Sequence, residues 1–178
     1  MKSLALFPVA AAMLLFGPMT ARLSAQKAPQ GLDVCPNPSQ PCRSADKLFA
    51  PYELSFRLPT RLKPNTAYRS VPFYAVVVDR RRSASTDCDA GEFTTSVERE
   101  RKKAQALFPT RKAFSSPQCP DMSALSYLID GKNNTQVFTA IYAGKTRREA
   151  QNVLGKAKNH FPDAKVHRMQ AAFEVIWQ

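Results

Sequence analysis

The second half of the chain repeats the pattern of the first half. In each copy an apolar run leads into a basic segment with helical spacing that ends in Phe-Pro, and a lysine follows three residues after the proline. The apolar runs occupy 73–78 and 137–142, and an alternating apolar run closes each copy at 125–130 and 173–178. Each copy is therefore predicted to form one strand, one helix and two further strands.

Two such units can share one sheet, because each alone is too small to bury the apolar stripe of its helix. We expect an α+β fold of the ferredoxin-like βαββαβ type over residues 71–178, with one antiparallel sheet backed by two helices. Residues 26–70 are expected to form a proline-rich extended arm, which contributes little core up to about Ala50. Alternating side chains at 52–58 predict an extra strand, and prolines on both sides favour an edge position.

Both predicted helices carry start signals. Thr95 with Glu98, and Thr146 with Glu149, match a capping box, in which a hydroxyl and a carboxylate satisfy backbone N–H groups of the first turn. The spacing predicts inner stripes made of Val97, Ala104, Leu107 and Phe108 in the first helix and of Ala150, Val153, Leu154, Ala157 and Phe161 in the second. The basic run 99–103 is expected to face solvent, with Glu98 and Lys102 at ion-pair spacing.

The last elements follow from shorter patterns. Strands are expected at 165–169 and 173–177, because apolar and polar residues alternate there. Between the two copies, the sequence Asp-Gly-Lys-Asn-Asn at 130–134 predicts a turn.

The first 25 residues have the features of a secretory signal peptide. A lysine at position 2 precedes an apolar run at 4–16 that is too short to span a bilayer, and Ala25 offers a small residue for cleavage. The alternative is an uncleaved N-terminal anchor, which Gly17 and Pro18 disfavour. We therefore expect residues 1–25 to be removed, leaving a periplasmic or secreted protein with no transmembrane segment.

Four cysteines agree with export, because an even number in an exported chain usually forms disulfides. Three pairings are possible among Cys35, Cys42, Cys88 and Cys119. We favour 35 with 42, which share a short proline-rich loop, and 88 with 119. A zinc site is disfavoured because the chain has no CxxC pair and only two histidines, His160 and His167. No metal or other cofactor is expected.

The chain is strongly basic. It has 26 Lys and Arg residues against 14 Asp and Glu; removing Lys2 and Arg22 with the signal peptide leaves 24 against 14, a net charge of +10. Such an excess favours anionic polymers such as nucleic acid, a membrane surface or acidic cell-wall material. Export argues against nucleic acid. The alternative is that the surplus charge only aids solubility.

One pattern in the second copy is more specific: a strand that ends in glycine, then a helix with an early alanine and an apolar pair, then Phe-Pro. The residues are Phe138-Thr139-Ala140-Ile141-Tyr142-Ala143-Gly144, Glu149-Ala150, Val153-Leu154 and Phe161-Pro162. This pattern resembles the bacterial sporulation-related repeat, or SPOR, domain. That family is built as a βαββαβ pseudo-repeat and binds peptidoglycan glycan strands, so the resemblance implies the same fold and ligand here.

The resemblance also implies where a glycan would bind. The family pattern turns Ile141 and Ala143 toward the helices, so that Phe138 and Tyr142 point to the opposite, open face of the sheet, with Tyr74 as their equivalent in the first copy. Aromatic rings there would form a platform for sugar rings.

Basic residues near the platform are expected to pair with the carboxylates of muramic acid units. The candidates are Arg147, Lys165 and Arg168. The alternative is that the arm and the 52–58 strand pack over this face, which would make the aromatic residues ordinary core.

Nothing in the sequence favours catalysis. Neither histidine has a nucleophile motif near it, and no phosphate loop, metal-binding helix motif or dinucleotide fingerprint is present. The sequence therefore predicts an exported, non-catalytic cell-envelope protein that binds peptidoglycan glycan strands. The main alternative is an envelope protein-interaction or structural factor that binds no glycan. A small secreted hydrolase is the weakest of the three hypotheses.

Overall fold

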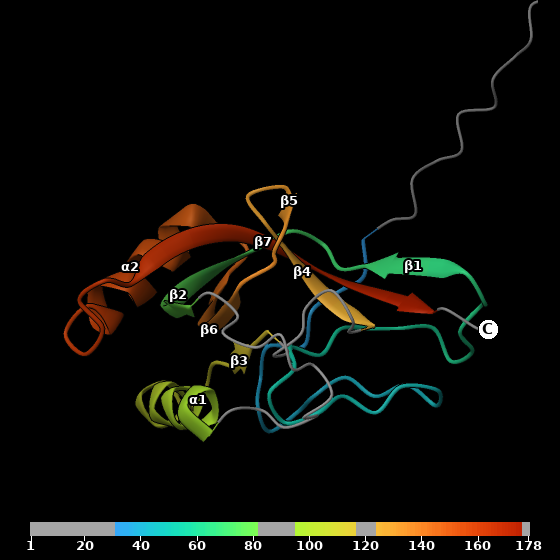
Figure 1. Cartoon of the computed structure of the whole chain (residues 1–178), viewed down its shortest axis with the longest axis horizontal. Coiled ribbons are helices and arrows are strands. Elements are labelled where there is room, and N and C mark those ends of the chain that lie inside the picture. The colour runs from blue at the N-terminus through green and yellow to red at the C-terminus, as the bar shows by residue number, and fades with distance from the viewer. Residues whose placement is uncertain (1–30, 82–94, 117–123, 176–178) are drawn as a thin grey trace, which may run out of the picture.

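The fold is given by a computed structural model that describes residues 31–81, 95–116 and 124–175. Within these residues the chain forms seven strands and two helices (Figure 1). In chain order they are β1 (Thr66–Arg69), β2 (Phe73–Arg81), α1 (Thr95–Leu107), β3 (Ala113–Ser115), β4 (Leu125–Ile129), β5 (Lys132–Asn133), β6 (Val137–Gly144), α2 (Arg147–Ala157) and β7 (Lys165–Val175).

One antiparallel sheet contains all seven strands. Its order is β3-β6-β2-β7-β4-β5, and β1 pairs with the end of β7. Helix α1 joins β2 to β3, which lie on either side of β6, and α2 joins β6 to β7, which lie on either side of β2. The two sequence copies are therefore two interleaved βαβ units, and the predicted ferredoxin-like α+β fold is confirmed.

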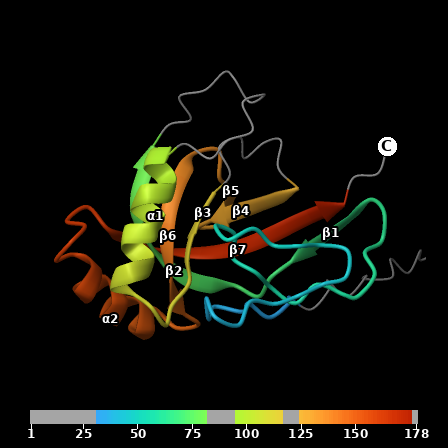
Figure 2. The same ribbon diagram turned by 90° about the horizontal axis from the view of Figure 1, so that it is seen from below.

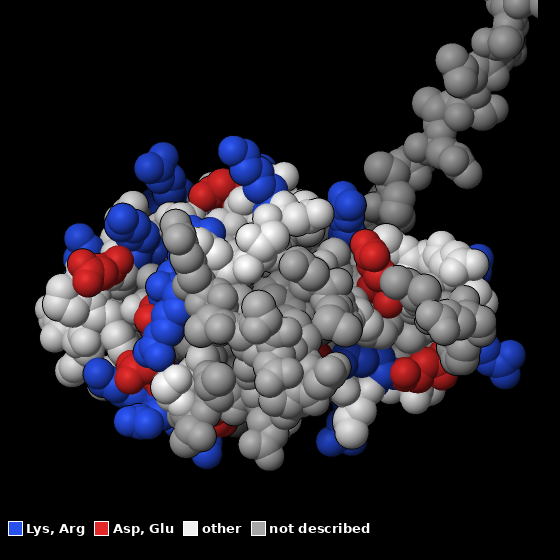
Figure 3. Space-filling view, viewed as in Figure 1, with Lys and Arg blue, Asp and Glu red and all other residues white. Residues whose placement is uncertain are grey.

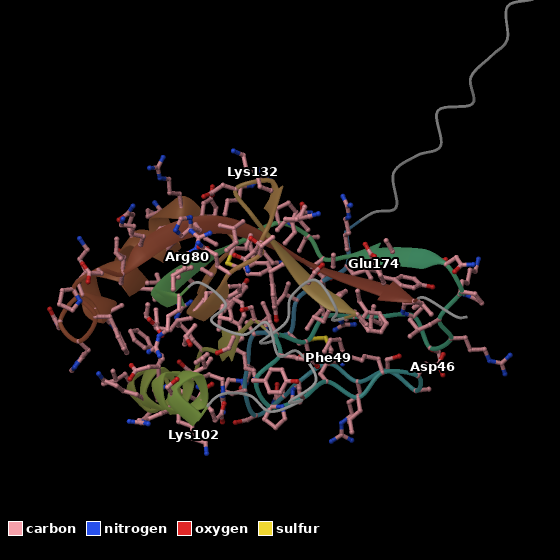
Figure 4. The ribbon with its side chains drawn as sticks, viewed as in Figure 1. Asp46, Phe49, Arg80, Lys102, Lys132 and Glu174 are labelled. Carbon is pink, nitrogen blue, oxygen red and sulfur yellow. A yellow bond between two sulfur atoms is a disulfide. The ribbon has the colours of Figure 1, made fainter. Side chains whose placement is uncertain are left out.

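The β4–β5 hairpin begins at the end of the first copy, leads into the second, and extends the sheet beyond β7. Asp130 (φ 50°) and Gly131 (φ 81°) are both left-handed, as a two-residue type I′ hairpin turn requires. The turn predicted at 130–134 is therefore shorter than expected, because Lys132 and Asn133 already pair with β4. Lys132 points from this hairpin into solvent (Figure 4).

Two strand predictions are wrong. β7 is one continuous strand rather than two, because β2 pairs with its first part and β4 takes over at Met169, so the ladder is never interrupted. The segment 52–58 forms no regular strand: only Phe56 makes an isolated bridge, to Val34. Its other backbone groups bond to scattered partners, such as Leu54 N–H to the Tyr127 hydroxyl at 3.1 Å. The strand before β2 is instead β1, near the end of the segment expected to form the extended arm.

The two faces of the sheet are covered by different parts of the chain. On one face both helices pack on β2, β3 and β6. The core on this side consists of Val76, Val78, Ala104, Phe108, Ala113, Ile141, Ala143, Ala150, Val153, Ala157, Phe161 and Ala164. Figures 1 and 2 both place the helices at the left of the molecule and the chain from 31 to 62 away from them, towards β4, β7 and β1.

The segment 31–62 covers the other face. Leu54 and Phe56 are fully buried there and pack against sheet residues such as Phe73 and Phe114. Even the first part of the arm takes part, because Leu32, Val34 and Phe49 pack partly buried on the same core. None of residues 31–50 is buried, however, so the expectation that this part of the arm contributes little core is confirmed for the described residues.

The helices differ in how well their sequence predicts them. α2 begins with the predicted capping box: Glu149 N donates to Thr146 Oγ1 at 3.3 Å, and Thr146 N donates to Glu149 Oε2 at 2.8 Å. Its predicted inner residues are buried except Leu154, which is only partly buried.

α1 begins at Thr95 as predicted, but it buries Arg101, which was expected to face solvent. The Arg101 guanidinium donates to both oxygens of Glu98, at 2.7 and 2.6 Å, and this pairing offsets the cost of burying the charge. Lys102 is the weaker partner of Glu98, at 3.8 Å. Leu107, expected inside, is 37% exposed.

The Cys35–Cys42 disulfide is present as predicted. Ser55 holds the loop that it closes: Cys35 N donates to the Ser55 carbonyl at 2.9 Å and Cys42 N to Ser55 Oγ at 3.0 Å. The predicted pair of Cys88 and Cys119 and the predicted signal peptide at 1–25 lie outside the described residues. Among the described helices, neither is long and apolar enough to cross a bilayer.

Candidate anion-binding cleft

The aromatic residues expected to form an open platform lie apart. Phe138 (1% exposed) and Tyr142 (7% exposed) are core residues beneath the segment 31–62, as the alternative interpretation held. Tyr74 lies on the opposite, helix-covered face and is partly exposed. Ile141 and Ala143 do face the helices, so the predicted orientation of β6 is confirmed. The prediction of an exposed aromatic platform is wrong, because the arm covers that face of the sheet.

Four of the six predicted binding residues meet elsewhere. They line a cleft of about 400 Å³ between α2 and the first part of β7, and we call it the basic cleft. These four are Tyr74, Arg147, Lys165 and Arg168; the other lining residues are Asp130, Gln151, Leu154, Lys158, Ala164 and Val166. Figure 3 shows basic side chains gathered on this side of the molecule, over α2 and the β5 hairpin.

Helix α2 supplies one wall of the basic cleft. Arg147, Gln151, Leu154 and Lys158 follow one another at i, i+4, i+7 and i+11, which places them on a single helix stripe. The capping box at Thr146 fixes the start of the helix, so Arg147 is its first residue, and Lys158 is its C-cap. The wall therefore carries a cation at each end.

The sheet supplies the floor. Tyr74 in β2 lies directly opposite Arg168 in β7, and the next pair on the same face is Val76 with Val166. Residues opposed across an antiparallel pair point to the same face with Cβ atoms about 4.5–5.5 Å apart. An aromatic ring and a guanidinium group therefore stand side by side at the base of the basic cleft.

Asp130 is the acidic residue among those that line the cleft, and it is already engaged. His167 Nδ1 donates to its carboxylate at 2.7 Å, and the Arg168 backbone N–H donates at 3.1 Å. Partial burial acts to raise the pKa of Asp130, but these hydrogen bonds and nearby positive charges together lower it. The carboxylate therefore stays ionised, and it holds the hairpin against β7.

The cations of the basic cleft remain available for a ligand. Within the described residues, none of them forms an ion pair with an acidic side chain; these cations are Arg147, Lys158, Lys165 and Arg168. Guanidinium and ammonium groups bind carboxylates and phosphates through charge-assisted hydrogen bonds, and arginine does so with two parallel bonds. The arrangement thus suits an anionic ligand that also presents a surface to the Tyr74 ring.

Sequence reasoning missed part of this site. Gln151 and Lys158 were not predicted, although their spacing from Arg147 on a helix places them on its stripe. Asp130 was assigned to the end of a strand and to a turn, and to no binding site. Within the described part of the chain, no group of three or more His, Cys, Asp or Glu residues is placed to hold a metal ion.

No protein-family model matches this sequence, and no curated protein or solved structure was found to be similar to it. The resemblance to SPOR domains therefore rests on the motif residues of the second copy alone. A function has to be proposed from the chemistry of the basic cleft.

Proposed function

We propose that this protein is a non-catalytic protein of the bacterial cell envelope that binds peptidoglycan glycan strands through the basic cleft. One observation carries the proposal: four cations that lack acidic partners among the described residues surround one partly exposed aromatic ring, Tyr74. The acidic residue beside them, Asp130, is occupied by His167 and by the backbone of Arg168.

The chemistry of peptidoglycan fits such a surface. Its muramic acid units and peptide stems carry carboxylates, which charge-assisted hydrogen bonds from Arg147 and Lys158 on the helix wall can hold. Sugar rings present C–H groups that pack on an aromatic face, and Tyr74 offers one at the floor of the basic cleft. Charge fixes the carboxylates while the ring fixes the orientation of the sugar.

Two further observations support the proposal. The Cys35–Cys42 disulfide is compatible with an extracytoplasmic location, where disulfides persist. The motif residues of the second copy, which resemble a SPOR domain, include Gly144 and the capped start of α2, and these position Arg147. The proposed surface is the helix-side cleft, because the aromatic residues of the other sheet face are buried.

Co-sedimentation with purified sacculi tests the proposal. The wild-type protein, oxidised and folded, should sediment with sacculi at an ionic strength of about 0.1 M. The double variant Arg147→Glu/Lys158→Glu should bind sacculi at least about tenfold more weakly. Two cations that would bind carboxylates are replaced by carboxylates that repel them.

A matched control introduces the same change of charge at a different place on the protein. Arg61→Glu/Lys63→Glu alters net charge by the same amount at exposed positions of the arm, far from the basic cleft in sequence and outside its lining. Sedimentation of this control should stay within about twofold of wild type. Absence of wild-type binding would leave the alternative, an envelope protein-interaction factor without glycan binding.

A further inference from the structure

A second concave site lies on the other flank of α2. It has a volume of about 390 Å³ and is formed where α1 ends and the second half of α2 passes beside it. Pro109 follows Phe108 and stops α1, so the chain turns away and leaves the last apolar residues of α1 beside the flank of α2. We call this site the helix groove.

The floor of the helix groove is apolar. Phe108 and Val153 are buried beneath it, and Leu107 stands at its side with 37% of its surface exposed. In the described part of the chain, Leu107 is one of two large apolar residues that are exposed; the other, Leu48, lies in the arm. An exposed leucine that borders a concave apolar floor indicates a place where another apolar side chain can be buried.

The rim of the helix groove is basic. Arg111 and Lys156 line it, and no Asp or Glu is among its described lining residues. The exposed amides of Asn152 and Asn159 also border it, and neither side-chain amide forms a hydrogen bond within the residues that the structure describes. The rim therefore offers cations and amide groups to a ligand with carboxylates and a peptide backbone.

We infer that the helix groove is a docking site for an acidic peptide segment of another protein, one that places an apolar side chain beside Leu107 and carboxylates against Arg111 and Lys156. Charge complementarity selects an acidic partner, and the apolar floor selects a peptide over a bare polyanion. The volume falls at the lower end of the range for ligand sites, about 300–1,000 Å³, so a short segment fills it. This inference is independent of glycan binding in the basic cleft.

The chain provides matched variants for each part of the inference. Lys156 and Lys158 both lie at the C-terminal end of α2, but Lys156 lines the helix groove and Lys158 lines the basic cleft. Leu107 and Leu48 are both exposed leucines, but only Leu107 borders the helix groove. Within each pair, the two substitutions make the same change of charge or hydrophobicity, but only one of them lies at the helix groove.

Fluorescence anisotropy with a labelled hexapeptide of sequence EDLFDE measures the docking. Its affinity for the full oxidised protein should fall at least about fivefold with Lys156→Glu and stay within about twofold with Lys158→Glu. Leu107→Ser should weaken binding about threefold and Leu48→Ser should not. A second peptide, EDSSDE, has the same charge without the apolar pair and should bind more weakly than EDLFDE to wild type.

Each other outcome overturns the inference. If the two lysine variants lose the same affinity for EDLFDE, or if the two peptides bind equally well, the peptide is attracted only by the net positive charge of the protein. No saturable binding of EDLFDE, or its displacement by soluble glycan strands, would contradict a peptide site. Leu107→Ser removes an exposed side chain, so it gives a readout even if Lys156→Glu impairs folding.

Discussion

Tyr74 and Arg168 are cross-strand partners on the helix-side face of the sheet, at the floor of the basic cleft. If the ring supports a sugar, replacing Tyr74 by Leu should weaken sacculus binding about fivefold, since aromatic stacking contributes about 0.5–1.5 kcal/mol. Tyr74→Phe keeps the ring and should retain binding. Sedimentation assays with sacculi compare the two variants. Equal binding by Tyr74→Leu and Tyr74→Phe would show that the Tyr74 ring does not contribute to the site.

The Asp130 carboxylate should make stability depend on pH at the acid end. Its hydrogen bonds from His167 and Arg168 hold its pKa below the ordinary value, so its contribution is present above about pH 4 and is lost as pH falls through the lowered pKa. Asp130→Asn keeps a residue that tolerates the left-handed turn but removes the titration. Urea unfolding between about pH 5 and 2 should show a shallower loss of stability in Asp130→Asn than in wild type.

The exposed turn residue Asp163, for which the structure shows no side-chain hydrogen bond within the described residues, provides the control. Asp163→Asn should change the free energy of unfolding at neutral pH by no more than about 0.5 kcal/mol, as is usual for a surface substitution. If Asp130→Asn and wild type lose stability in parallel as pH falls, the pairing of Asp130 with His167 does not contribute to the free energy of unfolding.

Gly144 should be intolerant of a side chain. Its φ is 131°, and a Cβ placed there would lie 2.7 Å from both Cβ and Oε2 of Glu149, the residue that caps α2. Gly144→Ala should lower the free energy of unfolding by about 1–3 kcal/mol.

Gly155 gives the opposite expectation within the same repeat copy. It lies in α2, and a Cβ there would meet no atom within 4 Å. Gly155→Ala should raise the free energy of unfolding by about 0.5–1 kcal/mol, because alanine loses less backbone entropy in a helix. Denaturant unfolding of both variants measures the contrast, and destabilisation by Gly155→Ala would contradict the open surface of α2.

The contact between Tyr127 and Leu54 tests whether the arm is part of the folded core. Leu54 N–H donates to the Tyr127 hydroxyl at 3.1 Å, and both residues are buried. Tyr127→Phe would leave this N–H without a partner and should cost about 1–3 kcal/mol. Tyr68 is the control: its hydroxyl accepts from the exposed Lys63 N–H at 2.8 Å, where water can replace it, so Tyr68→Phe should cost under about 1 kcal/mol. Equal effects in chemical denaturation would contradict the buried position of the arm.

Local signals in the sequence predicted much of the fold. β6 is apolar on both faces and lies inside the sheet between β3 and β2, covered on both sides, and all eight of its residues are buried. The capping box at Thr146 and Glu149 fixed the start of α2 correctly. These features depend on neighbouring residues, so they can be recognised without knowing the rest of the chain.

The binding surface could not be predicted in the same way. Matching the two copies residue by residue made Tyr74 the equivalent of Phe138, but a slip of one position moves a side chain to the other face of a strand. The β2–β6 ladder has a register shift directly after Tyr74, and Tyr74 faces the helices while Phe138 faces the arm. Whether a sheet face is open depends on distant segments, here 31–62.

The central claim is that the basic cleft holds the carboxylates of peptidoglycan. It is tested most directly by the dissociation constant for soluble peptidoglycan fragments, measured before and after chemical amidation of their carboxylates. Amidation should weaken the binding of fragments to wild type at least about tenfold. It should change the affinity of Arg147→Glu/Lys158→Glu little, because this variant has already lost the cations that pair with the carboxylates. Equal affinity of wild type for native and amidated fragments would contradict the claim.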